Sequence, residues 1–267
     1  MKLFISSDME GTSGIAHWDE TDYDRGGRWY EYFRLIMSAE VAAACSGAHD
    51  GGARHIRVKD AHDSARNIIP SERPSYAELN RGWSGHPFCM VSGVEEGFGA
   101  LAFTGYHSPA HSAFNPLAHT LTTDLDEITI NGIRASEFLI HSYIAAMLNI
   151  PVIFLSGDMG ICEEAKTLIP GIVVVPTNYC RGNGVSSNQP QASQQLIHDG
   201  MKRAVENNGV NCIPKLPSSF EVTVKYHVHH HAYKNSFYPG TTQVGEKTIA
   251  FSSDNYWDVM RFFHFTT

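Results

Sequence analysis

Short apolar runs and amphipathic stretches alternate along the chain. An apolar run at residues 3–5 predicts a short buried strand. Residues 28–48 carry apolar side chains three and four positions apart, which predicts a helix that ends at Gly51 and Gly52. A second apolar run at 55–58 predicts another strand. Strand, helix and strand together form a βαβ unit, which implies a parallel pair joined by a right-handed crossover.

The same alternation continues through the next 150 residues. We expect further strands at 88–91, 101–103, 127–131, 152–155 and 172–175. We expect helices at 134–148, 162–168 and 191–206, a short helix near Ala77, and a loop at 182–188. The pattern therefore predicts an α/β fold with a mostly parallel central sheet flanked by helices.

The pattern changes beyond Pro214 and Pro217. Residues 220–224 alternate as a half-exposed strand does, residues 243–252 read as a hairpin around Gly245, and residues 254–263 predict a closing helix capped by Asp254. We therefore expect two parts: an α/β metal-binding catalytic body at 1–213, and a smaller α+β portion at 214–267 that shapes the binding pocket or contacts between subunits.

Composition narrows the class of protein. Hydrophobic residues make up 42% of the 267 residues and charged residues 18%, as in ordinary globular proteins. The formal net charge of -8 argues against general nucleic-acid binding. The five cysteines are widely spaced and form no C-x-x-C pair, which favours reduced thiols. No signal peptide and no stretch of membrane-spanning length is evident. We therefore expect a cytoplasmic protein that does not contact a membrane.

Two carboxylates follow the first predicted strand. Asp8 and Glu10 are two positions apart, so they project to the same side of an extended segment. Gly11 and Gly14 allow the backbone to turn closely around them. Adjacent anions are best tolerated around a divalent cation. The ordinary alternative is a solvated acidic turn after a strand.

Histidines follow other predicted strands. Asp60 and His62 come after the second strand and His107 after the strand at 101–103, while His119 lies in the loop beyond. In parallel sheets, ligands bind at the carboxyl ends of strands, so we expect these residues to converge on one crevice.

Glu137 lies in the first turn of a predicted helix and completes the candidate set. A mixed carboxylate and histidine set suits zinc or manganese and supports hydrolytic chemistry. Lone histidines are more often surface or hydrogen-bonded core residues, and Glu137 could simply complement the helix dipole. The run at 227–231, which includes His229, His230 and His231, reads as a solvated strand end, with accessory metal binding as the alternative.

The chain resembles the DppA-type D-aminopeptidases, a family of zinc peptidases. The resemblance rests on SDMEGTSG at 7–14, DAH at 60–62, GYH at 105–107 followed by His119, ING at 130–132 followed by Glu137, SGD at 156–158 and YPGT at 238–241. It runs from the first residue to the last predicted helix.

The resemblance implies two zinc ions per subunit, held by Asp8, Glu10, His62, His107 and Glu137, with Asp8 between them. Manganese is a further candidate for the same ligands. His119 would be the catalytic residue. The implied substrate is a short peptide with a free N-terminus, from which a D-amino acid such as D-Ala is removed, and the implied assembly is a homodecamer. Another metal-dependent amidohydrolase or phosphoesterase, and a non-catalytic metal- or peptide-binding protein, remain as alternatives.

Overall fold

The computed structural model describes residues 1–267 and contains two β-sheets. The larger sheet has seven strands in the order β3-β2-β1-β4-β7-β8-β9. All neighbouring pairs are parallel except β8 and β9, which form an antiparallel hairpin. The strands are β1 (Lys2–Ser7), β2 (His55–Asp60), β3 (Ala77–Asn80), β4 (Ala100–Tyr106), β7 (Val152–Asp158), β8 (Val173–Arg181) and β9 (Gly184–Ser187). The predicted α/β fold with a mostly parallel sheet is confirmed.

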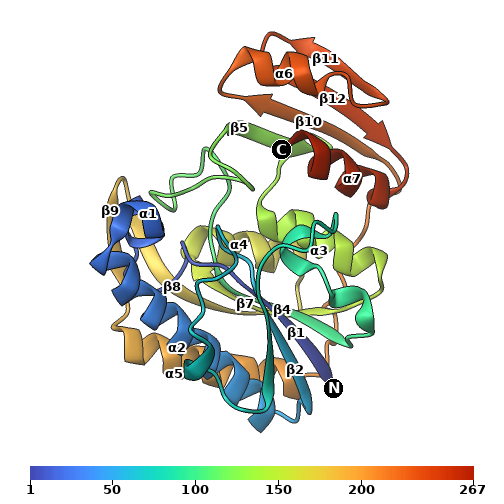
Figure 1. Ribbon diagram of the computed structural model, residues 1–267. Helices are drawn as coiled ribbons and strands as arrows, with labels where there is room; N and C mark the ends of the chain where they lie inside the picture. The colour runs from blue at the N-terminus through green and yellow to red at the C-terminus, as the bar shows by residue number, and fades with distance from the viewer.

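Helices lie on both faces of this sheet (Figure 1). The long helix α2 packs along α5 on one face, and α3 and α4 lie on the other. The helices are α1 (Tyr23–Gly26), α2 (Arg28–Asp50), α3 (Glu137–Met147), α4 (Met159–Leu168), α5 (Pro190–Glu206), α6 (His229–Asn235) and α7 (Tyr256–Thr266). Short 3-10 turns occur at η1 (Trp18–Glu20), η2 (Pro70–Glu72), η3 (Cys89–Val91) and η4 (Val94–Glu96).

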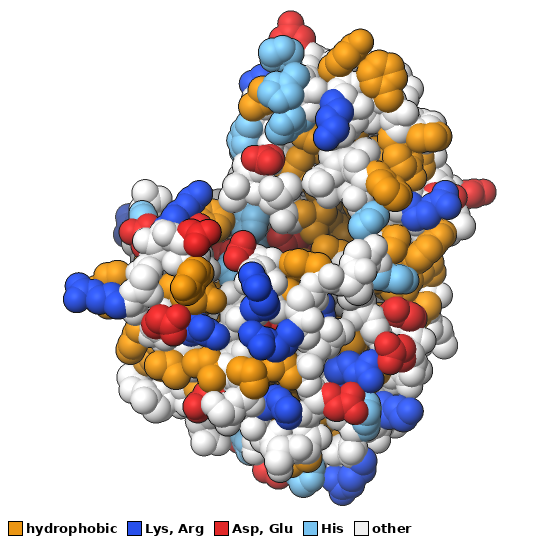
Figure 2. All heavy atoms as spheres, viewed as in Figure 1, with side chains coloured by type: hydrophobic (Ala, Val, Ile, Leu, Met, Phe, Trp, Pro, Cys, Tyr) orange, Lys and Arg blue, Asp and Glu red, His pale blue; other side chains and the backbone are white.

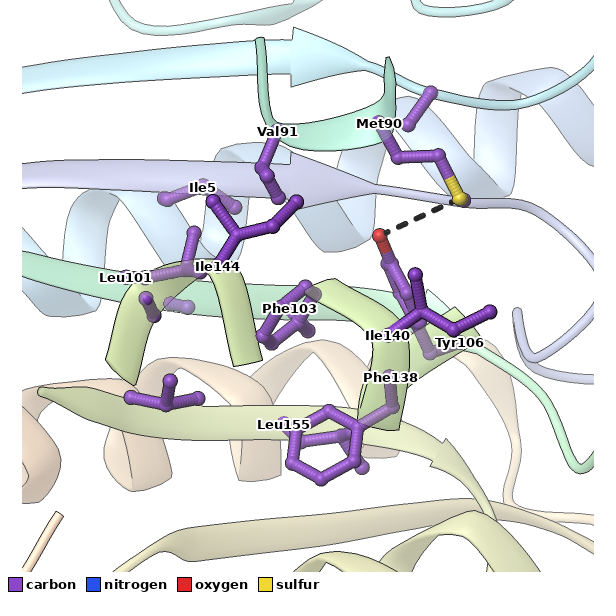
Figure 3. Close-up of a cluster of buried hydrophobic side chains, with 14 of the residues drawn as sticks. Ile5, Met90, Val91, Leu101, Phe103, Tyr106, Phe138, Ile140, Ile144 and Leu155 are labelled. Atoms are coloured by element: carbon purple, nitrogen blue, oxygen red, sulfur yellow. Dashed lines mark hydrogen bonds between the residues drawn. The ribbon is translucent and has the colours of Figure 1, made fainter. Parts of the chain in front are cut away.

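The core between α3 and the central strands is apolar and closely packed (Figure 3). Phe138 at the start of α3 is fully buried and meets Phe103 of β4 edge to face, with ring centroids 5.2 Å apart. The strands β1, β4 and β7 are buried along nearly their whole length, because helices cover both faces. This packing fixes the carboxyl ends of β1 and β4, from which the candidate site is built.

The second sheet has five strands in the order β11-β12-β10-β5-β6 and forms an upper lobe with α6 and α7 (Figure 1). Its strands are β5 (Leu125–Ile130), β6 (Ile133–Arg134), β10 (Phe220–Tyr226), β11 (Thr241–Gly245) and β12 (Thr248–Ser253). Strand β10 alternates strictly between buried and less buried residues, as an antiparallel strand with one covered face does. It pairs with β5, so chain segments on both sides of Pro214 contribute to this lobe.

Several local predictions were wrong. The segment near Ala77 is the edge strand β3, which forms because its backbone pairs with β2. Residues 88–91 form a 3-10 turn, since Cys89 adopts a positive φ of 46° that an extended strand does not allow. The expected loop at 182–188 contains β9, which pairs with β8. The last helix is capped by Asn255, whose side chain accepts the Trp257 N–H.

All five cysteines are free thiols, and Cys45, Cys162 and Cys212 are buried in the core. None of the helices is both long enough and apolar enough to cross a membrane.

Candidate metal centre

The candidate ligands lie at the carboxyl ends of three adjacent strands. Asp8 and Glu10 follow β1, His62 follows β2, and His107 follows β4 directly. In the sheet, β2 and β3 lie on one side of β1, whereas β4 and the later strands lie on its other side. The site therefore occupies the point where the strand order reverses, which is the usual location of binding sites in open α/β sheets.

Glycines bring the loop after β1 close to the end of β4. A Cβ atom on Gly105, whose φ is +68°, would lie 2.2 Å from the Asp8 carbonyl oxygen. A Cβ on Gly11 would lie 1.9 Å from the carbonyl oxygen of Tyr106. The Gly11 N–H instead donates to the Gly105 carbonyl over 2.8 Å. The two carboxylates can therefore reach His107 only because these positions have no side chain.

Glu137 and His119 approach the cluster from another direction. Glu137 is the first residue of α3, and its Oε1 accepts the Leu121 N–H over 2.7 Å. The ring of His119 stacks on that of His107, with centroids 4.4 Å apart and planes inclined by 10°. Trp18 meets the His119 ring edge to face at 5.3 Å. These contacts hold His119 beside the buried cluster.

The ligand-type atoms form overlapping groups. Asp8, Glu10 and His62 make one triad, Asp8, His107 and Glu137 a second, and Glu10, His107 and His119 a third; within each, the atoms lie within 4.8 Å of one another. His62 Nδ1 is 3.0 Å from Glu10 Oε2 and 3.3 Å from Asp8 Oδ1. His107 Nε2 is 3.4 Å from Asp8 Oδ2 and 3.5 Å from Glu137 Oε2. Asp8 is thus shared by the first two triads.

Each histidine of the cluster has one ring nitrogen within hydrogen-bonding distance of a backbone carbonyl oxygen. His62 Nε2 is 2.8 Å from the Thr21 oxygen, His107 Nδ1 is 2.9 Å from the Ser108 oxygen, and His119 Nδ1 is 3.0 Å from the Leu117 oxygen. A carbonyl only accepts, so we assign the hydrogen to these nitrogens. The other nitrogen of each ring faces carboxylate oxygens. A neutral ring presents a lone pair there, so a cation, either a proton or a metal ion, must lie between the ring and the carboxylates; this arrangement is typical of metal-binding histidines.

Burial makes the excess of negative charge costly. Asp8, Glu10 and Glu137 are at most 3% exposed, and Asp8 Oδ2, Glu10 Oε2 and His107 Nε2 lack any hydrogen-bond partner. Burial and the neighbouring Glu10 raise the pKa of Asp8 well above its usual value. Burial opposes charge on His62, yet the carboxylates of Glu10 and Asp8 raise its pKa well above the usual value. The residues present therefore fit divalent metal ions, which would satisfy these atoms.

A cleft of about 520 Å³ opens over the cluster. Its lining includes Trp18, Asp22, Arg25, Trp83 and His119, together with Asp8, Glu10, His62 and Glu137 at its floor. Figure 2 shows the molecule hollowed between the upper lobe and the body, with acidic side chains in the hollow. The volume suits a small ligand such as a di- or tripeptide.

The six predicted site residues, Asp8, Glu10, His62, His107, His119 and Glu137, are all brought together. Asp60 lies apart from the cluster, because its carboxylate accepts the backbone N–H groups of Asn67 and Ile68. The histidine run was predicted as a solvated strand end. It follows β10 directly and is largely exposed, as predicted, but His229, His230 and His231 form the start of helix α6 on the upper lobe. Its residues take no part in the cluster.

Sequence reasoning missed the residues that hold the ligands. The carbonyl groups of Thr21, Ser108 and Leu117 accept the histidine N–H groups. Ser108 and Leu117 lie in one loop, and Asn115 of this loop donates a hydrogen bond to Asp158. Backbone carbonyls carry no side-chain signal. For Asp158 the sequence offered two signals, its place at the end of a strand and the SGD motif at 156–158, but neither indicated its role.

The fold and the cluster define a class of protein: an α/β protein with a mostly parallel sheet and a buried carboxylate–histidine cluster, suited to metal ions, at its strand ends. Comparison with known proteins narrows this class. A family model described as D-aminopeptidase matches residues 1–265. The chain therefore belongs to the D-aminopeptidase family, and it is a peptidase.

Individual relatives agree with this assignment. A D-aminopeptidase from Bacillus subtilis (strain 168) is 28% identical over 255 residues, which cover 95% of this chain and 92% of the relative. A solved structure described as the Zn-dependent D-aminopeptidase DppA from Bacillus subtilis, a self-compartmentalizing protease, is 25% identical and has a TM-score of 0.90. It covers 98% of this chain, and this chain covers 95% of it.

Proposed function

We propose that this protein is a two-zinc aminopeptidase that removes N-terminal D-amino acids, such as D-Ala, from short peptides. The observation that carries the proposal is the pair of triads that share Asp8. Asp8, Glu10 and His62 would hold one zinc ion, and Asp8, His107 and Glu137 the other. Family membership and the zinc-dependent relative support the choice of metal and substrate. Manganese suits the same ligands.

Zinc held by these residues would supply a Lewis acid for the peptide carbonyl and lower the pKa of water, as metal ions do in two-metal hydrolases. The chain itself supplies the proton transfer. His119 lines the cleft, and its Nε2 is free to accept a proton because Nδ1 is engaged by the Leu117 carbonyl. Burial and the neighbouring His107 lower the pKa of His119, which favours the neutral ring that can accept a proton. The same Nε2 would then return the proton to the leaving amine.

The cleft also favours a free N-terminus. Asp63 lines it in addition to the carboxylates of the cluster, whereas the charge of Asp22 is balanced by Arg25 at 3.0 Å, so a cationic α-ammonium group is attracted toward Asp63 and the cluster. An N-acetylated peptide has no such charge. We therefore expect D-Ala-D-Ala to be cleaved and its N-acetyl derivative to be left intact.

The first test measures alanine release from D-Ala-D-Ala, L-Ala-L-Ala and N-acetyl-D-Ala-D-Ala, with a chelator and after zinc is restored. Chelator-sensitive cleavage of the free D-peptide alone is expected. Cleavage of the L-peptide at an equal rate would refute the D-preference, and cleavage of the acetylated peptide would refute the aminopeptidase assignment.

Two variants test the assigned roles. His119→Ala should keep its zinc and lose about 10²- to 10⁴-fold in kcat, the usual contribution of a general acid–base residue. Asp8→Ala should lose both ions, since it is shared by both triads. His111→Ala is the matched control, because this exposed histidine of the same loop pairs with Asp126 away from the cluster. An Asp8→Ala protein with a full zinc content would contradict the bridging role.

We further propose that the chain forms a homo-oligomer, which family resemblance suggests is a decamer. Large apolar side chains are exposed on the upper lobe, including Tyr233, Phe237, Val244 and Phe265, and such side chains are typical of subunit contacts. Light scattering after size-exclusion chromatography gives the mass directly. A monomer at micromolar concentration would contradict this proposal.

Five free thiols favour a reducing, cytoplasmic location.

A further inference from the structure

A buried aspartate outside the cluster gathers four hydrogen bonds. Asp158 is the last residue of β7 and is fully buried. Its Oδ2 accepts the Ser108 N–H over 2.7 Å and the Asn115 amide over 3.1 Å. Its Oδ1 accepts the Ser108 hydroxyl over 2.6 Å and the Ile161 N–H over 2.9 Å. The carboxylate forms no ion pair with a lysine, arginine or histidine, so these four donors compensate its charge.

One branch of this network leads to His107. Ser108 is the next residue in the chain, and Asp158 binds it through both its backbone N–H and its hydroxyl. The Ser108 carbonyl in turn accepts the His107 Nδ1–H. The position of this peptide group determines the plane of the imidazole and leaves Nε2 directed at Asp8 and Glu137.

The other branch leads to His119 and Glu10 through Asn115. The Asn115 amide nitrogen donates both to Asp158 and to the Glu10 carbonyl, the latter over 3.2 Å. Its Oδ1 accepts the Leu117 N–H over 2.8 Å. The Leu117 carbonyl then accepts the His119 Nδ1–H. Hydrogen bonds, together with the backbone of Ser108 and of Leu117, therefore connect the two stacked histidines through one carboxylate.

We propose that Asp158 is a positioning residue that, with Asn115, sets the orientation of both His107 and His119 at the metal centre. The inference rests on the proposed function for the identity of the reaction, but the geometry concerns the metal-binding cluster itself. An ionised carboxylate is required, because four donors converge on two oxygens and a carboxamide would direct its own N–H groups at two of them. Asp158 belongs neither to the metal-binding groups nor to the lining of the cleft, and it acts through the 108–117 loop.

Asp158→Asn and Asn115→Ala separate the two branches. Asp158→Asn disturbs both histidines, so we expect Co²⁺ affinity, measured by competition with a chelator, to fall about 10- to 100-fold. The visible absorption spectrum of bound Co²⁺ should shift as well. Asn115→Ala leaves both Ser108 bonds in place. It should lose kcat at an unchanged KM, with a smaller loss of Co²⁺ affinity.

Ser112→Ala is the matched control, since this partly exposed residue of the same loop bonds only within the loop. It should match the wild type in metal affinity, spectrum and kcat. The proposal is overturned if folded Asp158→Asn and Asn115→Ala proteins keep the wild-type Co²⁺ spectrum, affinity and kcat, with only a lower Tm. If Asp158→Asn does not fold, Asn115→Ala decides by its kcat and spectrum. Wild-type protein that cleaves no peptide would contradict the proposed function, while the Co²⁺ measurements would still test Asp158.

Discussion

Glu40 is a buried carboxylate beneath the loop that carries Asp8 and Glu10, and its replacement should stabilise the protein at alkaline pH. The residue lies in α2 and is 1% exposed. Its Oε1 accepts the Ser13 N–H over 3.1 Å, while Oε2 has no partner. Burial raises the pKa of this carboxyl from 4.5 to about 7. The native protein therefore binds a proton on Glu40 that the unfolded chain releases near pH 4.5.

The sign and the size of the effect follow from this shift. Below pH 4.5 Glu40 is protonated in both the native and the unfolded state, so its burial does not lower the free energy of unfolding through ionisation. The free energy of unfolding falls as the pH rises from 4.5 to 7, and above pH 7 it stays lower by the full amount. A difference of about 2.5 pKa units corresponds to about 3 kcal/mol at 1.36 kcal/mol per unit. In a domain of this size, such a change moves Tm by about 6–12 °C.

Glu40→Gln imitates the protonated form and keeps an acceptor for the Ser13 N–H. We expect the variant to match the wild type near pH 5 and to exceed it by up to about 3 kcal/mol at pH 8. Urea titrations from pH 5 to 8 give the free energy of unfolding of both proteins, and Glu31→Gln, at an exposed position of the same helix, is the control. A difference between Glu40→Gln and wild type that does not change with pH would refute the reasoning.

Three further predictions concern the centre and the core beneath it. Removal of zinc by a chelator should lower Tm by about 8–16 °C, because a ligand present at 1,000 times its Kd adds about 4 kcal/mol to stability; an unchanged Tm in differential scanning calorimetry would argue against a metal in this cluster. Gly105→Ala should lose metal, since the added Cβ would lie 2.2 Å from the Asp8 carbonyl oxygen, whereas Gly99→Ala, with no atom closer than 3.7 Å, should retain it in zinc analysis. Phe138→Ala should cost about 3–5 kcal/mol in urea titrations, as expected for a fully buried aromatic ring, and a loss below 1 kcal/mol would contradict its place in the core.

The cluster could be predicted from sequence because the order of strands and the residue types agree. Asp8, Glu10, His62 and His107 each follow an apolar run, and parallel strands bring such positions to one edge of the sheet. That argument needs no side-chain geometry. The same argument wrongly placed Asp60 in the crevice, since Asp60 also lies at the end of a strand. Position at a strand end does not show whether a carboxylate faces the crevice or binds its own loop, as Asp60 does.

The errors occurred where a distant partner decides the local structure. The four residues of β3 and the four of β9 are extended because β2 and β8 offer free edges. A window of four residues carries too little periodicity to show this. The histidine run follows the strand β10, yet it turns into α6, which packs on β10 and β12. The contacts of α6 are with strands that are distant in sequence, so the spacing of the histidines does not predict the helix.

The three histidines show why metal binding and the order of the loops depend on each other. Each ring is oriented by a carbonyl from a different segment, namely Thr21, Ser108 and Leu117. Without a metal ion, the buried carboxylates are balanced only by protons on the histidines, and they raise the pKa of His62 and His107 accordingly. With a cation, the same atoms draw the segments together. Metal affinity therefore depends on residues that never touch the ion, and any substitution that loosens one of the three carbonyls should weaken it.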